Sequence, residues 1–417
     1  MNLAQDLLIE SFAPQLNSMR IAVVTETFPP EVNGVAMTLG RIVEGLVCRG
    51  HTVQLVRPRQ LRETSHPMLN GIEEILSSGL PVPAYADLRF GLPSKRRLSK
   101  LWGSHRPDVV HVVTEGPLGW SAIAAARKMQ LPVTSSFHTN FQSYSPHYGL
   151  GLFKKPIDSY LRKLHNRTQA TMVPTRALMQ DLQSRGYQNL KLLSRGVASD
   201  LFSPTKRSAD LRSRWGAGDD DMVVLVVGRL AKEKNLGLVV ESFRAIHAHN
   251  PAAKMVFVGD GPLRPALQAA CPCSIFAGNR QGEDLAAHYA SGDLFLFPSL
   301  TETYGNVVPE ALASGLAVVS YACAAALELI TSGTDGMLVS VDSEQEFIDT
   351  ALSVATQPEL LKGLKRSSVK SVAHLAWDTI FDNFIDHLAR VIHVSNAGLS
   401  ADDTNGFAGK SVSQTNA

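Results

Sequence analysis

Residues 298–315 read Pro-Ser-Leu-Thr-Glu-Thr-Tyr-Gly-Asn-Val-Val-Pro-Glu-Ala-Leu-Ala-Ser-Gly and directly follow the apolar run 294–297. The apolar run is typical of a buried parallel strand, and Pro298 ends it because proline cannot donate to a sheet ladder. Pro309 is tolerated early in a helix, and Gly315 provides a left-handed cap at the helix end. The stretch therefore predicts a strand, a loop and a helix, followed by another strand from residue 316.

Two acids lie in this unit, Glu302 in the loop and Glu310 about one turn into the helix. Gly305 lets the backbone approach a ligand closely, and the amides after it form a helix amino terminus suited to an anion. Two carboxylates beside a donor-rich turn suit a ligand with both hydroxyls and phosphate, such as a nucleotide-sugar. Two solvated glutamates on an ordinary strand–loop–helix unit would have the same spacing, so the pair alone does not decide.

Length and composition limit the possible classes. The chain has 417 residues, enough for two domains, and its 44% apolar and 19% charged residues are typical of a globular protein. The net charge of +2 gives no support for a nucleic-acid partner. The four cysteines lack zinc spacing, so we predict no metal and free thiols. No apolar run could span a bilayer and the start does not resemble a secretory signal, so we expect a cytoplasmic protein.

Strands and helices alternate along most of the chain, which predicts an α/β fold with two Rossmann-like domains. We expect an extension over residues 1–18, one domain over 19–197 and a second over 198–376. A helix over 377–394 should brace the first domain, and a polar tail over 395–417 should be disordered.

Several polar residues follow predicted strands, where open α/β sheets bind ligands. Gly34 lies in the loop after the first strand, His138 follows the strand 132–137, and Arg229 and Lys234 follow the strand 222–227. A guanidinium and an ammonium there can hold the phosphates of a leaving nucleotide. Taken singly, each fits a blander interpretation: a turn glycine, a histidine bonded to nearby backbone, or surface cations.

The phrase Pro-Ser…Glu-Thr-Tyr-Gly-Asn-Val…Glu-Ala…Ala-Ser-Gly, together with Gly-Arg-Leu…Glu-Lys-Asn after residue 227 and Ser-Phe-His-Thr at 136–139, resembles glycosyltransferase family 4. These are retaining enzymes of the GT-B architecture, with two Rossmann-like domains whose parallel sheets face across a cleft. The resemblance covers about residues 20–377. Tyr304 replaces the usual phenylalanine, and Ala198 stands where the family commonly has aspartate.

The resemblance implies roles for individual residues. It makes His138, Arg229, Lys234 and Glu302 catalytic, with His138 touching the transferred sugar and the two cations holding the departing diphosphate. It assigns donor binding to Gly34, Gly278, Tyr304, Gly305, Asn306, Val307 and Glu310, with Glu310 on the ribose and Gly278 beside the base. The donor is a UDP- or GDP-hexose used as a substrate, and no cofactor is implied. In the front-face mechanism of this family, the leaving phosphate takes the proton of the acceptor.

The same phrases resemble the lipid-directed mannosyl-, glucosyl- and sulfoquinovosyltransferases of the family. Two basic segments, over 89–106 and 154–167, carry interleaved apolar residues and could lie on an anionic membrane surface. They could equally be solvated helix faces. A lipid acceptor at the inner membrane face is therefore a hypothesis.

Rival functions are also testable against the sequence. A nicotinamide-dependent oxidoreductase needs a Gly-x-Gly-x-x-Gly opening a helix, which is absent. A catalytically idle binding protein would lack an acid or a cation that this chain keeps. A GT-B enzyme with a soluble sugar or sugar-phosphate acceptor remains the closest alternative. The nucleotide, hexose, acceptor and oligomeric state stay open.

Overall fold

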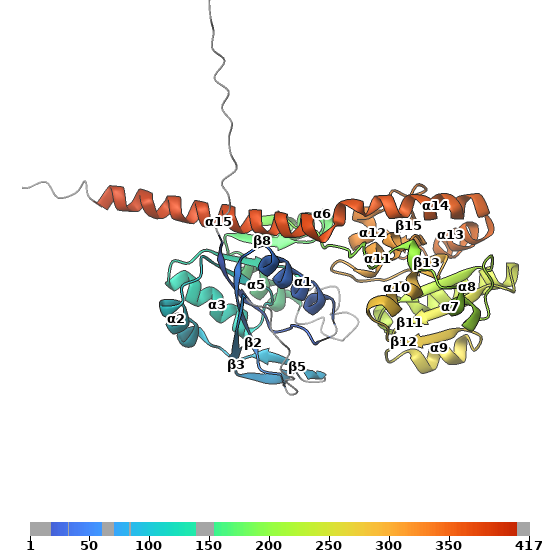
Figure 1. Cartoon of the computed structure of the whole chain (residues 1–417), viewed down its shortest axis with the longest axis horizontal. Helices are drawn as coiled ribbons and strands as arrows, with labels where there is room; N and C mark the ends of the chain where they lie inside the picture. Colours follow the sequence, from blue (N-terminus) through green and yellow to red (C-terminus); the bar gives the residue numbers. More distant parts are fainter. Residues whose placement is uncertain (1–17, 32, 61–70, 83–84, 139–153, 407–417) are drawn as a thin grey trace, which may run out of the picture.

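The structure, a computed structural model, describes residues 18–31, 33–60, 71–82, 85–138 and 154–406. The first half of the chain forms one parallel sheet with flanking helices, and the second half forms another (Figure 1). The predicted extension 1–18 lies outside the described residues except for Ser18. Within the described ranges, no helix is long and apolar enough to cross a membrane.

The N-terminal sheet has seven parallel strands in the order β3-β2-β1-β6-β7-β8-β9. Its strands are short apolar runs, such as β1 with the sequence RIAVV, that are buried on both faces, as parallel sheets require. The elements are β1 Arg20–Val24, α1 Gly34–Cys48, β2 Thr52–Pro58, β3 Ile72–Ser77, β4 Gly79–Val82, β5 Tyr85–Gly91, α2 Lys95–Ser104, β6 Val109–Val112, α3 Pro117–Lys128, β7 Val133–Ser136, α5 Lys154–His165, β8 Ala170–Val173, α6 Arg176–Ser184 and β9 Leu190–Leu192.

The C-terminal sheet has six parallel strands in the order β12-β11-β10-β13-β14-β15. The elements are η2 Pro204–Lys206, α7 Ala209–Arg214, β10 Val223–Val227, η3 Lys232–Lys234, α8 Leu236–His249, β11 Lys254–Val258, α9 Arg264–Ala270, β12 Ile275–Gly278, α10 Gly282–Ala290, β13 Leu294–Phe297, α11 Val307–Ala313, β14 Ala317–Tyr321, α12 Ala324–Leu329, β15 Met337–Val339, α13 Glu344–Thr356, α14 Pro358–Ser371, η4 Ala373–Leu375 and α15 Trp377–Gly406.

Both sheets reverse their strand order once, between β1 and β6 and between β10 and β13. In open α/β sheets the loops that leave the carboxyl ends of the strands at such a point diverge and leave room for a ligand. In the C-terminal sheet these loops are residues 228–235 and 298–306, which contain the predicted cations and Glu302.

The long helix α15 returns from the second half to cover the first (Figure 1). Its residues Phe381, Phe384, Ile385 and Leu388 belong to the same buried cluster as strands β1 and β2 and helix α1. Gly45 on α1 permits this contact, since a Cβ there would lie 2.5 Å from the Phe381 ring. At the start of α15, Arg49 bonds Asp378 at 2.7 Å and Asp382 at 2.9 Å.

Two sequence predictions differ from the structure. The helix expected over 377–394 continues to Gly406, so the tail predicted to be disordered from Ser395 is helical over 395–406, and residues 407–417 lie outside the described part. The sequence reading also missed β3 and the antiparallel pair β4–β5, in which Gly79 pairs with Gly91.

Candidate active site

The predicted ion-binding residues of the second half meet at the carboxyl ends of β10 and β13. Lys234 Nζ contacts Glu302 Oε1, and Ser299 Oγ donates to the same oxygen at 2.9 Å. Lys234 Nζ also lies 5.2 Å from the centre of the Phe297 ring, a cation–π contact. The side chains of Lys234 and Glu302 are only 19% and 10% exposed, so the two charges neutralise each other in a partly buried place. If the Lys234 ammonium bound a phosphate in place of Glu302, the Glu302 carboxylate could accept a hydrogen bond from another donor.

Arg229 lies at the start of the neighbouring loop and is exposed. The preceding Gly228 has φ +140°, and a Cβ on Gly259 would lie 2.0 Å from the Gly228 carbonyl oxygen. Only glycine fits at residue 259, so the loops after β10 and β11 pack with their backbones in contact. Gly278, at the end of β12, joins this layer because its carbonyl accepts the Gly259 amide at 2.8 Å.

Gly305 has φ +87°, which a side chain rarely adopts, and it turns the chain into α11. In the described part of the chain, the amides of Gly305, Asn306 and Val307 donate to no acceptor. These three donors lie beside Glu302, since a Cβ on Gly305 would be 3.5 Å from the Glu302 side chain. The loop therefore offers free backbone donors next to the Lys234–Glu302 pair, which suits an anionic ligand.

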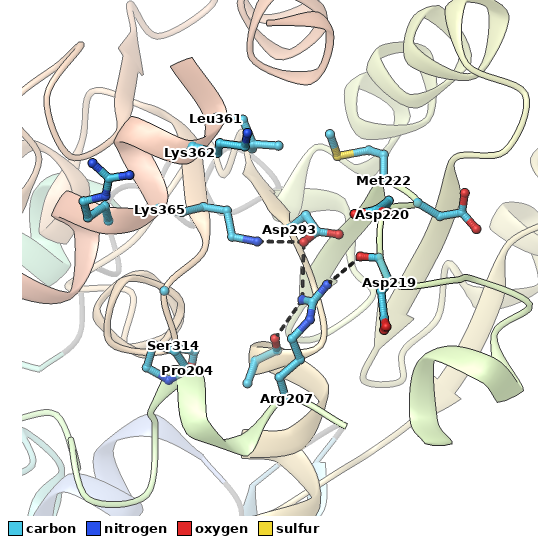
Figure 2. Close-up of a pocket in the computed structure, with 14 residues that line it drawn as sticks. Pro204, Arg207, Asp219, Asp220, Met222, Asp293, Ser314, Leu361, Lys362 and Lys365 are labelled. Carbon is cyan, nitrogen blue, oxygen red and sulfur yellow. Dashed lines mark hydrogen bonds and ion pairs between the residues drawn. The ribbon is translucent and has the colours of Figure 1, made fainter. Parts of the chain in front are cut away.

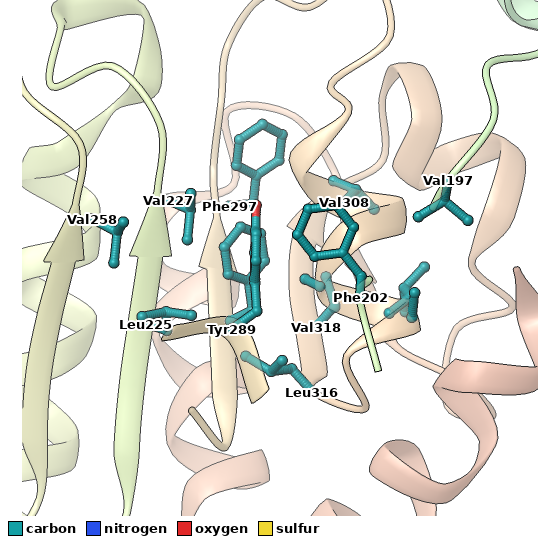
Figure 3. Close-up of a cluster of buried hydrophobic side chains, with 14 of the residues drawn as sticks. Val197, Phe202, Leu225, Val227, Val258, Tyr289, Phe297, Val308, Leu316 and Val318 are labelled. Carbon is teal, nitrogen blue, oxygen red and sulfur yellow. The ribbon is translucent and has the colours of Figure 1, made fainter. Parts of the chain in front are cut away.

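Glu310 lies one turn into α11 and borders the core of the second half. Tyr289 donates a hydrogen bond to Glu310 Oε2 at 2.8 Å. Figure 3 shows the Tyr289 ring among Leu225, Phe297 and Val318 in that core. Burial raises the pKa of Glu310 to about 7 in spite of the Tyr289 bond. Because Oε2 already has a protein donor, Oε1 is the oxygen of Glu310 best placed to take a ligand hydroxyl.

The side chain of Tyr304 is buried beside the loop that leads into α11. Its side chain is 1% exposed, and its hydroxyl lies 3.2 Å from Ser194 Oγ and donates to the Arg195 carbonyl at 3.3 Å. The ring belongs to the buried core of the second half, and its hydroxyl reaches the segment that leaves the first half. The hydroxyl of Tyr304 therefore has protein partners, and the donor-binding role that the resemblance implies for residue 304 stays a prediction.

Arg195 joins predicted residues from both halves. Its Nη2 lies 3.3 Å from His138 Nδ1, and its Nη1 donates to Asn306 Oδ1 at 3.2 Å. A Cβ on Gly34 would lie 3.7 Å from both Arg195 Nη1 and Asn306 Nδ2. The guanidinium carbon also lies 5.5 Å from the centre of the Tyr304 ring. Gly34, His138 and Asn306 therefore converge on one guanidinium at 7% exposure.

The environment of His138 fixes its protonation. Burial lowers the pKa of His138 well below its usual value, and the Arg195 cation lowers it further. A guanidinium can only donate, so His138 Nδ1 is the acceptor and the proton of the neutral ring lies on Nε2. His138 thus presents a hydrogen-bond donor. Sequence reasoning missed Arg195 as a site residue, and the one signal was its position before Gly196, where the chain passes between the halves.

Sequence reasoning also missed Glu26, an acid in the loop after β1. Its Oε1 accepts the amides of Gly91 and Leu118, both at 3.2 Å, and burial raises its pKa to about 7. A Cβ on Gly116 would lie 1.9 Å from Glu26 Oε2, so the carboxyl packs against bare backbone at the start of α3. Glu26 thus lies at the carboxyl ends of the strands of the N-terminal sheet with a pKa that burial raises.

In the described residues, no group of three or more His, Cys, Asp or Glu side chains is arranged to hold a metal.

Comparison with known proteins gives two family matches. Residues 32–201 match the model "Glycosyltransferase Family 4", and residues 221–357 match "Glycosyl transferases group 1".

Relatives match nearly the whole chain. A GDP-mannose-dependent α-mannosyltransferase of Corynebacterium glutamicum is 31% identical over 91% of both chains. An α-monoglucosyldiacylglycerol synthase of Acholeplasma laidlawii is 25% identical over 88% of this chain and 98% of its own. The crystal structure of HepE from Anabaena with UDP-glucose superposes with a TM-score of 0.70 at 18% identity, over 89% of this chain and 100% of that one. The chain therefore belongs to glycosyltransferase family 4 and is a glycosyltransferase with the GT-B fold.

Proposed function

We propose that this glycosyltransferase moves mannose from GDP-mannose to a membrane lipid or a lipid-linked glycan, with retention of the anomeric configuration. The observation that supports the donor is the 31% identity to a GDP-mannose-dependent mannosyltransferase over 91% of both chains. A lipid acceptor is supported by the relative named for its glucosyldiacylglycerol product. Transfer to a soluble sugar or sugar phosphate is the alternative.

In this proposal the donor diphosphate lies between Arg229, Lys234 and the free amides at residues 305–307. Preorganised donors of this kind contribute about 3 kcal/mol each to stabilising the charge that grows on the leaving group. Once Lys234 turns to the phosphate, the Glu302 carboxylate accepts from a hydroxyl of the sugar. Glu310 Oε1 accepts from the ribose. Gly278 ends strand β12, which lies two strands from β10 in the sheet, and in this proposal it borders the base of the nucleotide.

His138 and Arg195 complete the sugar side of the proposed site. Neutral His138 donates from Nε2 to a sugar hydroxyl, while Arg195 fixes the ring and holds Asn306 at the start of α11. The acceptor oxygen bonds the anomeric carbon on the face from which the diphosphate leaves. The acceptor proton passes to the departing phosphate oxygen, so no protein nucleophile is required.

The membrane part of the proposal rests on helix α2. Lys95, Arg96, Arg97 and Lys100 are exposed, while Leu98 and Trp102 on the other face are buried in the core. In α5, Lys155 and Lys163 are also exposed, and Tyr160 is 39% exposed. Each such cation contributes about 1 kcal/mol of attraction to an anionic lipid surface. We propose that α2 and α5 hold the enzyme peripherally at the inner face of the membrane.

Donor choice is tested by measuring nucleotide release from a panel of GDP- and UDP-hexoses with and without lipid extract. GDP-mannose should react at least about tenfold faster than UDP-glucose, because a pocket that pairs with one base leaves polar groups unpaired with the other. Release should require the lipid extract. Faster turnover of a UDP-hexose contradicts the proposed donor, and equal rates with a soluble acceptor favour the alternative.

Replacing Lys234 by methionine should lower kcat by about 10²–10³-fold, since a cation on the leaving group is lost. Lys232→Met is the matched control, because Lys232 is exposed two residues earlier in η3. Circular dichroism checks that both variants are folded. Equal kcat in the two variants would show that Lys234 does not act on the leaving group.

The protonation state of His138 predicts how kcat/KM changes at low pH. Transfer needs the neutral ring, so kcat/KM should fall as pH drops through the His138 pKa, which lies well below its usual value in the parent enzyme. Arg195→Met removes the neighbouring cation, so the pKa and the acid limb should both move to higher pH. Arg195→Lys keeps a cation and should keep the low acid limb. Identical limbs in the two variants, or a ring that NMR finds protonated near neutral pH in the parent, contradict the assignment.

Membrane attachment is tested by flotation with vesicles of anionic or zwitterionic lipid. The parent should float only with the anionic vesicles and at low salt, because the attraction is screened. Arg97→Glu on α2 should reduce flotation, whereas Lys191→Glu, the same charge change at an exposed residue of β9, should not. Failure of the parent to float with anionic vesicles at low salt removes this part of the proposal.

A further inference from the structure

A second pocket lies at the opposite edge of the C-terminal sheet from the candidate active site. It is lined by residues that precede strands, namely Met222 before β10, Asp293 before β13 and Ser314 before β14. Its volume is about 530 Å³, which is within the range of small-molecule sites. Figure 2 shows Asp293 at its centre, with Lys362 and Lys365 on one side and Asp219 on the other. None of the roles proposed above uses these residues.

Three cations contact the single carboxylate of Asp293 at the base of this pocket. Asp293 contacts Lys365 Nζ at 2.7 Å, Arg207 Nη1 at 3.3 Å and Arg212 Nη1 at 3.0 Å. One carboxylate therefore faces three positive charges. The Lys365 ammonium has donors left over, since Asp293 accepts only one of its three protons.

Helix α14 adds to this positive charge. Lys362, Lys365 and Arg366 are spaced i, i+3 and i+4, so they share one face of the helix and repel one another. The acid in contact with Lys362 is the exposed Glu359, at 3.5 Å. Within the described residues, Arg366 makes no hydrogen bond or ion pair. Like charges so close together destabilise the helix, and an anion bound between them would explain their presence.

Ser314 provides a separate indication of a ligand. Ser314 lines the pocket and is 2% exposed, yet its Oγ has no hydrogen-bond partner in the described part of the chain. A buried hydroxyl without a partner costs about 1–3 kcal/mol, so such groups normally find one. A phosphate oxygen or a hydroxyl within the pocket would satisfy it.

The opposite wall of the pocket suits hydroxyl groups. Asp219 and Asp220 are exposed there, and carboxylates accept from hydroxyls. We propose that this pocket binds a small phosphorylated polyol such as a sugar phosphate, with its phosphate on Lys362, Lys365, Arg366 and Ser314. Its hydroxyls face Asp219 and Asp220. The site is distinct from the donor site, because the pocket and the Lys234–Glu302 pair lie at opposite ends of the strands.

Isothermal titration of the whole protein with glucose 6-phosphate, inorganic phosphate and glucose tests this proposal. Both phosphates should bind, and glucose should not. Lys362→Gln with Arg366→Gln should weaken phosphate binding at least about tenfold by removing two charge-assisted contacts. Both residues are exposed, so folding should be unaffected, and Ser314→Ala should also weaken binding of both phosphates.

Lys234→Met is the control for the active site, since phosphate could also bind between Arg229 and Lys234. Binding to the second pocket should be the same in Lys234→Met and in the parent. The proposal is overturned if neither phosphate binds the parent at millimolar concentration. It is also overturned if binding is lost with Lys234 or is unchanged by the double substitution on α14.

Discussion

The candidate site depends on the contacts that the guanidinium of Arg195 makes. It belongs to the segment that leaves the first half of the chain, and it reaches back to His138 and forward to Asn306. His138 keeps its acceptor nitrogen toward Arg195, and Asn306 is held at the start of α11. These contacts fix the two halves of the chain relative to each other at the place where the sugar and the phosphates would meet. Buried polar contacts of this kind favour one arrangement over its neighbours because any other leaves donors unpaired.

The C-terminal sheet carries different charged groups at the carboxyl ends and at the amino ends of its strands. At the carboxyl ends of β10 and β13, a lysine and a glutamate neutralise each other beside free amides. At the amino ends, Asp293 is surrounded by three cations. Helix α11 runs between the two edges, with Asn306 before its first turn and Ser314 after its last. The same short helix thus contributes residues to both places.

Much of the fold could be predicted from the sequence, because parallel strands buried on both faces are short apolar runs with clear ends. The unit around residues 294–315 is confirmed, with β13 at Leu294–Phe297 and Gly315 at φ +79°. The strands missed around residues 72–91 contain charged residues and Pro81, so they lack that signal. The helical continuation to Gly406 was missed because its polar composition resembles that of a disordered tail.

Pairings within the site were harder to predict than its members. Lys234 and Glu302 were each predicted as site residues, but 68 residues separate them and no local pattern reveals that they form an ion pair. The burial of Tyr304 likewise depends on Ser194 and Arg195, which lie in another part of the chain.

The return of α15 has a consequence for the order of events during translation. Strand β1 is synthesised long before Phe384 and Leu388, which complete its apolar cover. The first half must therefore keep an apolar face uncovered until α15 has been synthesised, and a nascent chain with such a face exposed is prone to aggregate and is a natural client for a chaperone.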